Sequence, residues 1–158
     1  MEYLIRAIEP KDLERVLGII TRHKEEMEDT ARDFFRIYFD SSAQEPRQGR
    51  HYVVETEDDL VAVGGFIGFA EPGYHWVGFL YVDPYFQGQG IGTRLLERIA
   101  GEVSALGARQ LLVSIDPDDI PTQTVRFYEV NGFASAIIPD ASPPLPAKPS
   151  AQVWRKML

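Results

Sequence analysis

The chain has 158 residues, of which 44% are hydrophobic and 25% are charged, close to the composition of an ordinary soluble globular domain. Its 24 acidic and 16 basic side chains give a formal net charge of −8, so a nucleic-acid site on a basic surface is not expected. The sequence contains no cysteine, which excludes disulfides, thiolate metal ligands and a cysteine nucleophile. We therefore expect one domain whose partner is a small molecule or a cation.

The sequence also indicates where the chain is located and whether it binds a metal. No stretch approaches 18 consecutive apolar residues, and Met1–Arg6 lacks the pattern of a secretory signal. We expect a soluble, unprocessed, cytoplasmic chain with no membrane partner. The three histidines, His23, His51 and His75, share no metal-binding spacing, so no metal site is expected. The sequence leaves open whether the chain forms a homodimer.

The first forty residues predict one strand and two helices. An apolar run over Tyr3–Ala7 is typical of a short strand. Apolar residues then recur at helical spacing: Leu13, Val16, Leu17 and Ile20. A charged segment, 22–33, precedes four aromatic residues that favour a second short helix packed on a core: Phe34, Phe35, Tyr38 and Phe39. Residues 41–50 predict a loop.

The middle of the chain predicts an antiparallel meander followed by a helix. Three runs rich in Val, Phe, Tyr and Trp cover His51–Glu55, Leu60–Ala70 and Tyr74–Val82. After Pro84 the pattern changes to a glycine-rich turn and a long helix. The apolar stripe of that helix comprises Ile91, Leu95, Ile99 and Val103, and Gly107 is its predicted end.

The last part predicts a strand over Gln110–Ile115, a helix over Thr122–Asn131 and strands over Phe133–Ile138 and Ala151–Leu158. The proline-rich segment Pro139–Pro149 between the last two strands is interpreted as a stiff exposed loop, with a motif for aromatic-lined binding domains as the alternative. From this order we predict one α/β domain over residues 1–158, with three layers, a mixed central sheet of about six to seven strands and helices on both faces.

The sharpest feature is the run Gln87-Gly88-Gln89-Gly90-Ile91-Gly92-Thr93 between a strand and a helix. Glycines at such a junction let backbone N–H groups turn toward an anion, and the helix N-terminus adds its partial positive charge. Thr93 stands where a Rossmann fingerprint needs its third glycine, and the Gly-Lys-Ser/Thr ending of a P-loop is absent. A tight turn with no ligand is the structural alternative.

The surroundings of the turn carry a resemblance to a known family. Residues 77–106 resemble the coenzyme-binding motif of the GNAT (N-acetyltransferase) superfamily: an apolar strand, Val82-Asp83-Pro84, an aromatic pair, then Gln-x-x-Gly-x-Gly opening a long helix. Downstream, Arg126-Phe127-Tyr128-Glu129-Val130-Asn131-Gly132-Phe133 resembles the second motif of that family, Phe-Tyr-x-x-x-Gly-Phe. The element order of the family accounts for the rest of the chain.

This resemblance implies a site for acetyl-CoA. The strand backbone of Leu80, Tyr81 and Val82 would bind the pantetheine arm. The main-chain N–H groups of Gln87, Gly88, Gln89, Gly90, Ile91, Gly92 and Thr93 would hold the pyrophosphate, with the Thr93 hydroxyl as a further donor. Arg94 would reach a phosphate or remain a solvated helix arginine.

The resemblance also implies how protons move. Tyr128 matches the position of the general acid that protonates the leaving thiolate; the structural alternative is a core tyrosine. Family members that modify protein lysines commonly carry a glutamate eleven residues before Gln87, where this chain has Trp76. His75 and Glu71 are the remaining candidate bases. The second motif also departs from the family at its start, where Pro121 replaces the usual asparagine.

The acceptor side is predicted from the charged segment after the first helix. Glu25, Glu26 and Glu28 would attract a cationic amine, or form a solvated helix face. The nearby aromatic cluster would line the acceptor site or pack in the core. The sequence therefore predicts a metal-independent N-acetyltransferase that moves an acetyl group from acetyl-CoA directly to an amine of a small molecule, peptide or protein. The alternative is a non-catalytic acyl-CoA-binding or sensor module.

Overall fold

A single mixed sheet carries the two hydrophobic clusters of the chain, one on each face. The structure, a computed structural model, describes residues 2–40, 48–68 and 73–158. These residues form a sheet of seven strands in the order β1-β2-β3-β4-β5-β7-β6. The pair β4–β5 is parallel, and the other neighbouring pairs are antiparallel. The predicted α/β fold with a mixed sheet is confirmed.

The order of elements agrees with the sequence-based expectation. The strands are β1 (Leu4–Ala7), β2 (Gly49–Glu55), β3 (Leu60–Ile67), β4 (Tyr74–Val82), β5 (Gln110–Ile115), β6 (Ala134–Ser135) and β7 (Gln152–Met157). The helices are α1 (Leu13–His23), α2 (Glu28–Asp40), α3 (Ile91–Ala105) and α4 (Thr122–Val130), with the 3-10 turns η1 (Pro10–Asp12), η2 (Glu25–Met27) and η4 (Pro84–Phe86).

Some boundaries differ from the prediction. Helix α2 already begins in the charged segment, where Glu28 and Asp29 occupy its first turn and favour the positive end of the helix dipole. The predicted loop 41–50 is wrong at its end, since Gly49 and Arg50 pair with β3, and residues 41–47 lie outside the described part. Strand β6 is shorter than its apolar run.

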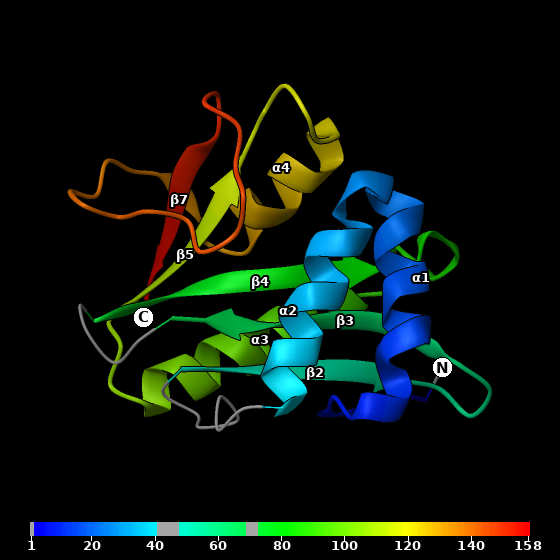
Figure 1. Cartoon of the computed structure of the whole chain (residues 1–158). Coiled ribbons are helices and arrows are strands. Elements are labelled where there is room, and N and C mark those ends of the chain that lie inside the picture. Colours follow the sequence, from blue (N-terminus) through cyan, green and yellow to red (C-terminus); the bar gives the residue numbers. More distant parts are fainter. Residues whose placement is uncertain (1, 41–47, 69–72) are drawn as a thin grey trace.

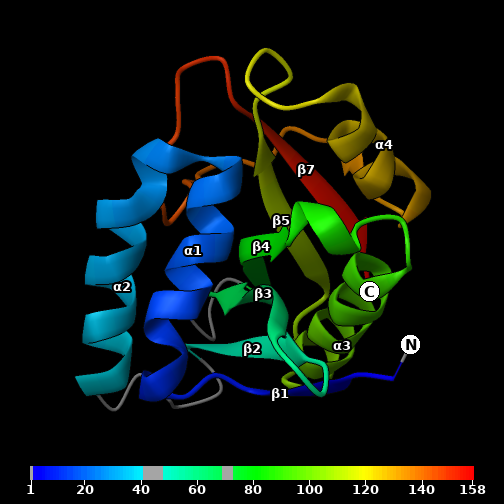
Figure 2. The ribbon, with the colours of Figure 1, turned by 90° about the vertical axis from the view of Figure 1, so that its right-hand side faces the viewer.

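The elements form three layers. Figure 2 shows α1 and α2 on one side of the sheet and α3 on the other. We call the two clusters the α1–α2 cluster and the α3 cluster. Helix α3 buries Ile91, Leu95, Leu96, Ile99 and Val103 against the sheet, and α1 buries Val16, Leu17, Ile19 and Ile20. Each fully buried aliphatic side chain of this kind contributes about 1.5–3 kcal/mol.

The predicted aromatic cluster packs in the core. Phe34, Phe35 and Tyr38 surround the His51 ring at centroid distances of 5.2, 5.3 and 5.1 Å, and Phe35 is fully buried. These side chains belong to the α1–α2 cluster or pack against it. Core packing, rather than an acceptor wall, is therefore their role in the fold.

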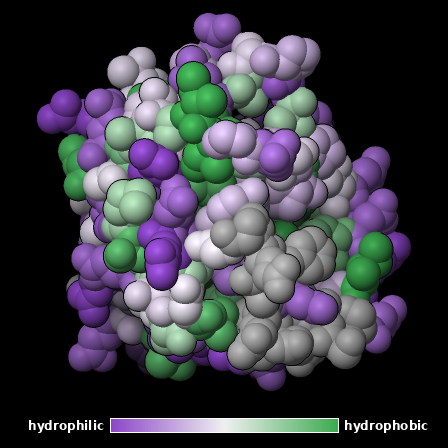
Figure 3. All heavy atoms as spheres, turned by 90° about the vertical axis from the view of Figure 1, so that its left-hand side faces the viewer, coloured by the Kyte–Doolittle hydropathy of each residue, from purple (hydrophilic) through white to green (hydrophobic). Residues whose placement is uncertain are grey.

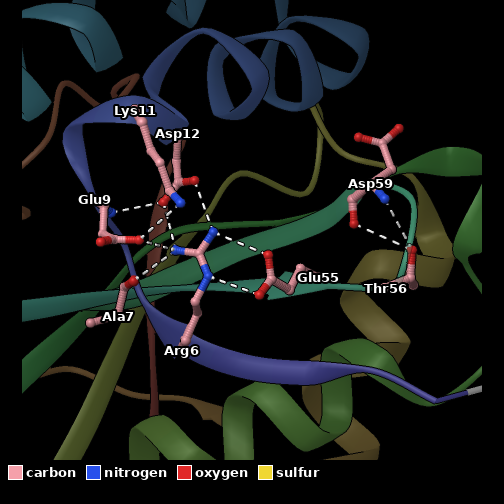
Figure 4. A network of polar contacts seen from close by, with 8 residues as sticks. All are labelled: Arg6, Ala7, Glu9, Lys11, Asp12, Glu55, Thr56 and Asp59. Atoms are coloured by element: carbon pink, nitrogen blue, oxygen red, sulfur yellow. Dashed lines mark hydrogen bonds and ion pairs between the residues drawn. The ribbon is translucent and has the colours of Figure 1, made fainter.

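A charged network joins β1 to the start of α1 (Figure 4). Arg6 donates to both carboxylate oxygens of Asp12, at 2.8 and 2.9 Å, and its Nε lies 3.1 Å from Glu55 in β2. These contacts hold the pKa of Asp12 below its usual value and raise that of Arg6, although burial of Asp12 opposes its shift. The bidentate geometry fixes the corner from which α1 crosses the sheet.

The outer surface mixes residue types. Figure 3 views the face at the left of Figure 1, where hydrophilic residues predominate and hydrophobic ones gather in small groups among the described residues. Some apolar side chains, such as Ile137 and Val130, are exposed, as is normal on folded proteins. Among the described residues, no helix has both the length and the apolar character needed to cross a membrane.

Candidate functional site

Strands β4 and β5 pair only where they begin. Tyr74–Trp76 lie opposite Gln110–Leu112, and no pairing follows, although β4 continues to Val82 and β5 to Ile115 among the described residues. Figure 1 shows the two strands diverging. Open α/β sheets bind ligands at the carboxyl ends of adjacent parallel strands. The diverging ends of β4 and β5 are therefore a candidate ligand site.

A cavity of about 1380 Å³ occupies this place. Its walls come from the second half of β4, the end of β5, the N-terminus of α3, the helix α4, the η2 turn and the proline-rich segment before β7. Segments that are far apart in the sequence therefore meet at the separated strand ends. The cavity is large enough for a ligand of cofactor size.

A bulge in β4 brings both faces of the sheet to the cavity. Val63 pairs with Tyr81 and Gly65 with Gly78, so β4 has one residue more than β3 in this interval. Phe79, inside the bulge, has a φ of 50°. Because one extra residue reverses the alternation of side chains, Leu80 packs toward the α3 cluster and Tyr81 toward the α1–α2 cluster.

The glycine-rich turn adopts the conformation that its sequence predicts. Gly88 and Gly90 both have a φ of 80°, in the left-handed region that is costly for residues with a Cβ. Gly90 is the N-cap of α3, whose 15 residues start at Ile91. The first N–H groups of the helix have no partner within it, so the turn offers donors and a partial positive charge to an anion.

The structure brings most of the predicted coenzyme residues to one cavity. The residues that line it are Leu80, Tyr81, Val82, Gln87, Gly88, Gly90, Ile91, Gly92 and Thr93. Gln89 and Arg94 are exposed and lie outside the lining. The strand and the turn therefore form one continuous wall.

Two side chains contact the backbone carbonyl oxygen of Val82. Gln87 Nε2 donates to the Val82 carbonyl oxygen at 3.2 Å, and His23 Nε2 lies 2.6 Å from the same oxygen. The His23 ring also packs against Tyr81, with 5.5 Å between centroids. His23 lines the cavity. No sequence signal indicates this, because His23 stands at the end of a predicted helix without a motif.

Tyr128 reaches the cavity from α4. It is 7% exposed and lines the wall together with Tyr81. Burial, followed by the neighbouring Tyr81 hydroxyl, raises the pKa of Tyr128 above its ordinary value. Burial, followed by the charge of Glu26, raises the pKa of Tyr81 to about 12. Both phenols therefore keep their protons at neutral pH.

The two candidate bases have different positions. His75 is 2% exposed, packs edge-on against Phe66 at 5.3 Å and lies outside the cavity lining. Glu71 lies outside the described residues. Trp76, where lysine-modifying relatives commonly carry a glutamate, is 4% exposed and lines the cavity.

Only one of the three predicted acceptor residues lies at the cavity. Glu26 lines the cavity, whereas Glu25 and Glu28 do not. Glu28 accepts a hydrogen bond from Arg32 at 3.3 Å within α2. A single carboxylate of the acidic segment therefore faces the cavity.

A second carboxylate on the cavity, Asp116, was missed. It directly follows β5, is 9% exposed and lines the wall. Ser150 donates to it at 2.8 Å, and the backbone N–H of Asp118 donates at 3.0 Å. The signal available in the sequence was its position at the carboxyl end of a buried strand. Among the described residues, no group of three or more His, Asp or Glu side chains is arranged to hold a metal ion.

The chain has counterparts among known proteins. A family model described as "Acetyltransferase (GNAT) domain" matches residues 47–135, which contain the glycine-rich turn and Tyr128. No curated protein matches the chain by sequence.

Solved structures resemble the whole chain. A GNAT-family acetyltransferase of Staphylococcus aureus Mu50 has a TM-score of 0.79 at 16% identity, covering 99% of each chain. A PaiA N-acetyltransferase from Thermoplasma acidophilum in complex with coenzyme A has a TM-score of 0.73 at 15% identity, covering both chains fully. The ribosomal-protein-S18-alanine N-acetyltransferase from Escherichia coli has a TM-score of 0.71 at 19% identity, covering 99% of this chain and 94% of the other. At these identities the likeness shows the fold.

Proposed function

Because the chain belongs to the GNAT acetyltransferase family, we propose that it moves an acetyl group from acetyl-CoA directly to a primary amine. The observation that carries this proposal is one cavity that joins the glycine-rich turn, the unpaired edge of β4 and the buried Tyr128 hydroxyl. Similar structures solved with coenzyme A support the choice of cosubstrate.

The coenzyme binds along the wall already described. The backbone of Leu80–Val82, which β5 leaves unpaired, takes the pantetheine arm as an added strand would. The turn Gln87–Thr93 holds the pyrophosphate, with a helix-dipole contribution of about 0.3–1 kcal/mol. Arg94, exposed in the first turn of α3, contacts a phosphate outside the cavity. In a chain with a net charge of −8, this local positive end is what attracts a polyanion.

The reaction forms one bond and breaks one. The neutral amine nitrogen attacks the thioester carbonyl carbon, the C–N bond forms, and the C–S bond breaks to release the thiolate of coenzyme A. The attacking nitrogen gives up one proton to water as the amide forms, and Tyr128 donates its proton to the thiolate and recovers one from solvent. The sequence has no cysteine to hold a thioester intermediate, which favours direct transfer in a ternary complex.

The amine must lose a proton before it attacks. For a lysine-like amine with a pKa of about 10.4, deprotonation at pH 7 costs about 4.6 kcal/mol. His75 packs in the core and does not line the cavity. Glu71 lies outside the described residues. We therefore assign this proton to water in the cavity rather than to a tuned base.

Titration calorimetry with acetyl-CoA tests the binding step, and a dissociation constant in the micromolar range is expected. Absence of heat and of a thermal shift at millimolar acetyl-CoA would overturn the assignment. The second candidate, a non-catalytic acyl-CoA sensor, is favoured by Trp76 and Pro121 at two family positions. Release of coenzyme A thiol above background with a broad panel of amines supports the transferase; binding without any transfer supports the sensor.

A further inference from the structure

The proline-rich segment before β7 forms part of the cavity wall, and we call the end of the cavity beside this segment the mouth. Of its 11 residues, Pro139–Pro149, five are proline, so ordering it costs less conformational entropy than ordering an average loop. Residues 143–148 line the cavity, and Leu145 packs against the α1–α2 cluster. Figure 2 shows the segment passing from the top of α1 and α2 to β7. We call this segment the strap.

One carboxylate ties the strap to both sides of the cavity. Lys148, in the strap, lies 3.0 Å from Oδ1 of Asp119, and Lys24, just after α1, lies 3.0 Å from Oδ2. The two ammonium groups hold the pKa of Asp119 below its usual value. The Ser150 hydroxyl adds a second anchor at 2.8 Å from Asp116. Three segments, after α1, after β5 and before β7, thus meet at Asp119.

The mouth under the strap is apolar with a small excess of negative charge. Met27, Phe79 and Leu145 supply apolar surface. Three carboxylates, Glu26, Asp116 and Asp119, face two ammonium groups there, and both ammonium groups are paired with Asp119. One positive charge on the acceptor is therefore enough to neutralise the excess negative charge of the mouth. A carboxylate on the acceptor would be repelled by Glu26 and Asp116.

We propose that the strap, held by Asp119, restricts the acceptor to small primary amines that carry one charge and an apolar body. This inference rests on the proposed transferase function and names the substrate class of the same site. A polyamine brings more positive charge than the mouth balances, and a lysine on a folded protein or a longer peptide needs the open surface that the strap occupies.

Rates with 2-phenylethylamine, spermidine and a hexapeptide with a free N-terminus and one lysine test this at saturating acetyl-CoA. We expect kcat/KM to be at least about tenfold higher for 2-phenylethylamine than for either other amine. Asp119→Asn removes both ion pairs, and we expect the ratio of 2-phenylethylamine to peptide to fall about threefold or more. The matched control is Asp118→Asn, an exposed neighbour outside the lining, which should keep the wild-type ratio.

These measurements distinguish an error in the proposed substrate class from an error in the proposed transferase function. Spermidine or peptide as the better acceptor would overturn the inference and leave the transferase in place. Coenzyme binding without transfer to any amine would overturn both. Equal ratios for Asp119→Asn and Asp118→Asn would overturn the role of the strap. Lys148→Gln, at a side chain 62% exposed, releases the strap with little risk to folding and should shift the ratio in the same direction as Asp119→Asn.

Discussion

A Cβ on Gly92, in the first turn of α3, would stand 3.2 Å from the ring of Phe127 in α4. Gly92 belongs to the glycine-rich turn, and Phe127 precedes Tyr128, whose ring lies edge-on to it at 5.2 Å. The two sequence motifs are therefore in contact, and the close approach that glycine permits positions the proposed acid beside the proposed coenzyme site.

Gly92→Val is expected to disturb this contact. The larger side chain forces Phe127 to move, with a loss of about 1–3 kcal/mol in the free energy of unfolding, and the affinity for acetyl-CoA should fall about tenfold because the turn shifts. Denaturant titration and calorimetry measure the two effects. Gly101→Val is the control, since Gly101 lies in the same helix with open space around it; an equal loss in both variants would contradict the argument.

Tyr128→Phe tests the proton donor. The substitution keeps the buried ring but removes the hydroxyl, so kcat should fall about ten- to a thousandfold, whereas the dissociation constant for acetyl-CoA should change little. Tyr74→Phe, in β4 but outside the cavity lining, should leave both quantities unchanged. Turnover of Tyr128→Phe at the wild-type rate would reduce Tyr128 to a packing residue.

The fold was predictable because its local signals agree. Alternating β-rich runs, the apolar stripe of α3 and the glycines before it all point to the same arrangement. The bulge at Phe79 was not predicted, although the isolated Gly78 within β4 is a signal for a bulge or a close backbone approach. A positive φ is uncommon for a phenylalanine, and Phe79 adopts it while it is buried in the α1–α2 cluster.

The coenzyme side of the site was easier to predict than the acceptor side. The turn Gln87–Thr93 is local in sequence, so its residues identify it. The acceptor mouth depends on contacts between distant segments, such as Lys24 with Asp119 and Lys148 with Asp119. The prolines of the strap indicate a stiff segment, but they do not indicate which part of the fold the segment packs against. The sequence therefore predicts only an exposed loop. Most of its residues are exposed, as predicted, and residues 143–148 also line the cavity.

The pH dependence of the reaction follows from the proposed proton transfers. With the acceptor deprotonated by water, kcat/KM should keep rising to at least about pH 8.5, because the amine has a pKa of about 10.4. Burial raises the pKa of Tyr128 above its ordinary value, so the acid stays protonated and no falling limb is expected below about pH 10. A plateau that begins near pH 6.5 would contradict this and show that a protein group rather than water takes the proton.

Stability should fall in acid because of His51. Its ring is 0% exposed, and neither ring nitrogen has a hydrogen-bond partner among the described residues. Burial lowers its pKa to about 3, whereas the unfolded chain has a value of about 6.5. Between these values the unfolded state binds a proton that the folded state does not. The free energy of unfolding therefore decreases as the pH falls from about 6.5 toward 3, by about 2 kcal/mol at pH 5 from this residue alone.

Denaturant titration of the wild type and His51→Leu at pH 8 and pH 5 measures this contribution. At pH 8 the histidine is neutral in both states, so the difference between the two proteins reports only packing against Phe34, Phe35 and Tyr38. At pH 5 the wild type should lose about 2 kcal/mol more than the variant does, relative to pH 8. The same loss in both proteins would show that the acid sensitivity comes from other groups and that the His51 ring takes up a proton in the folded state as readily as in the unfolded one.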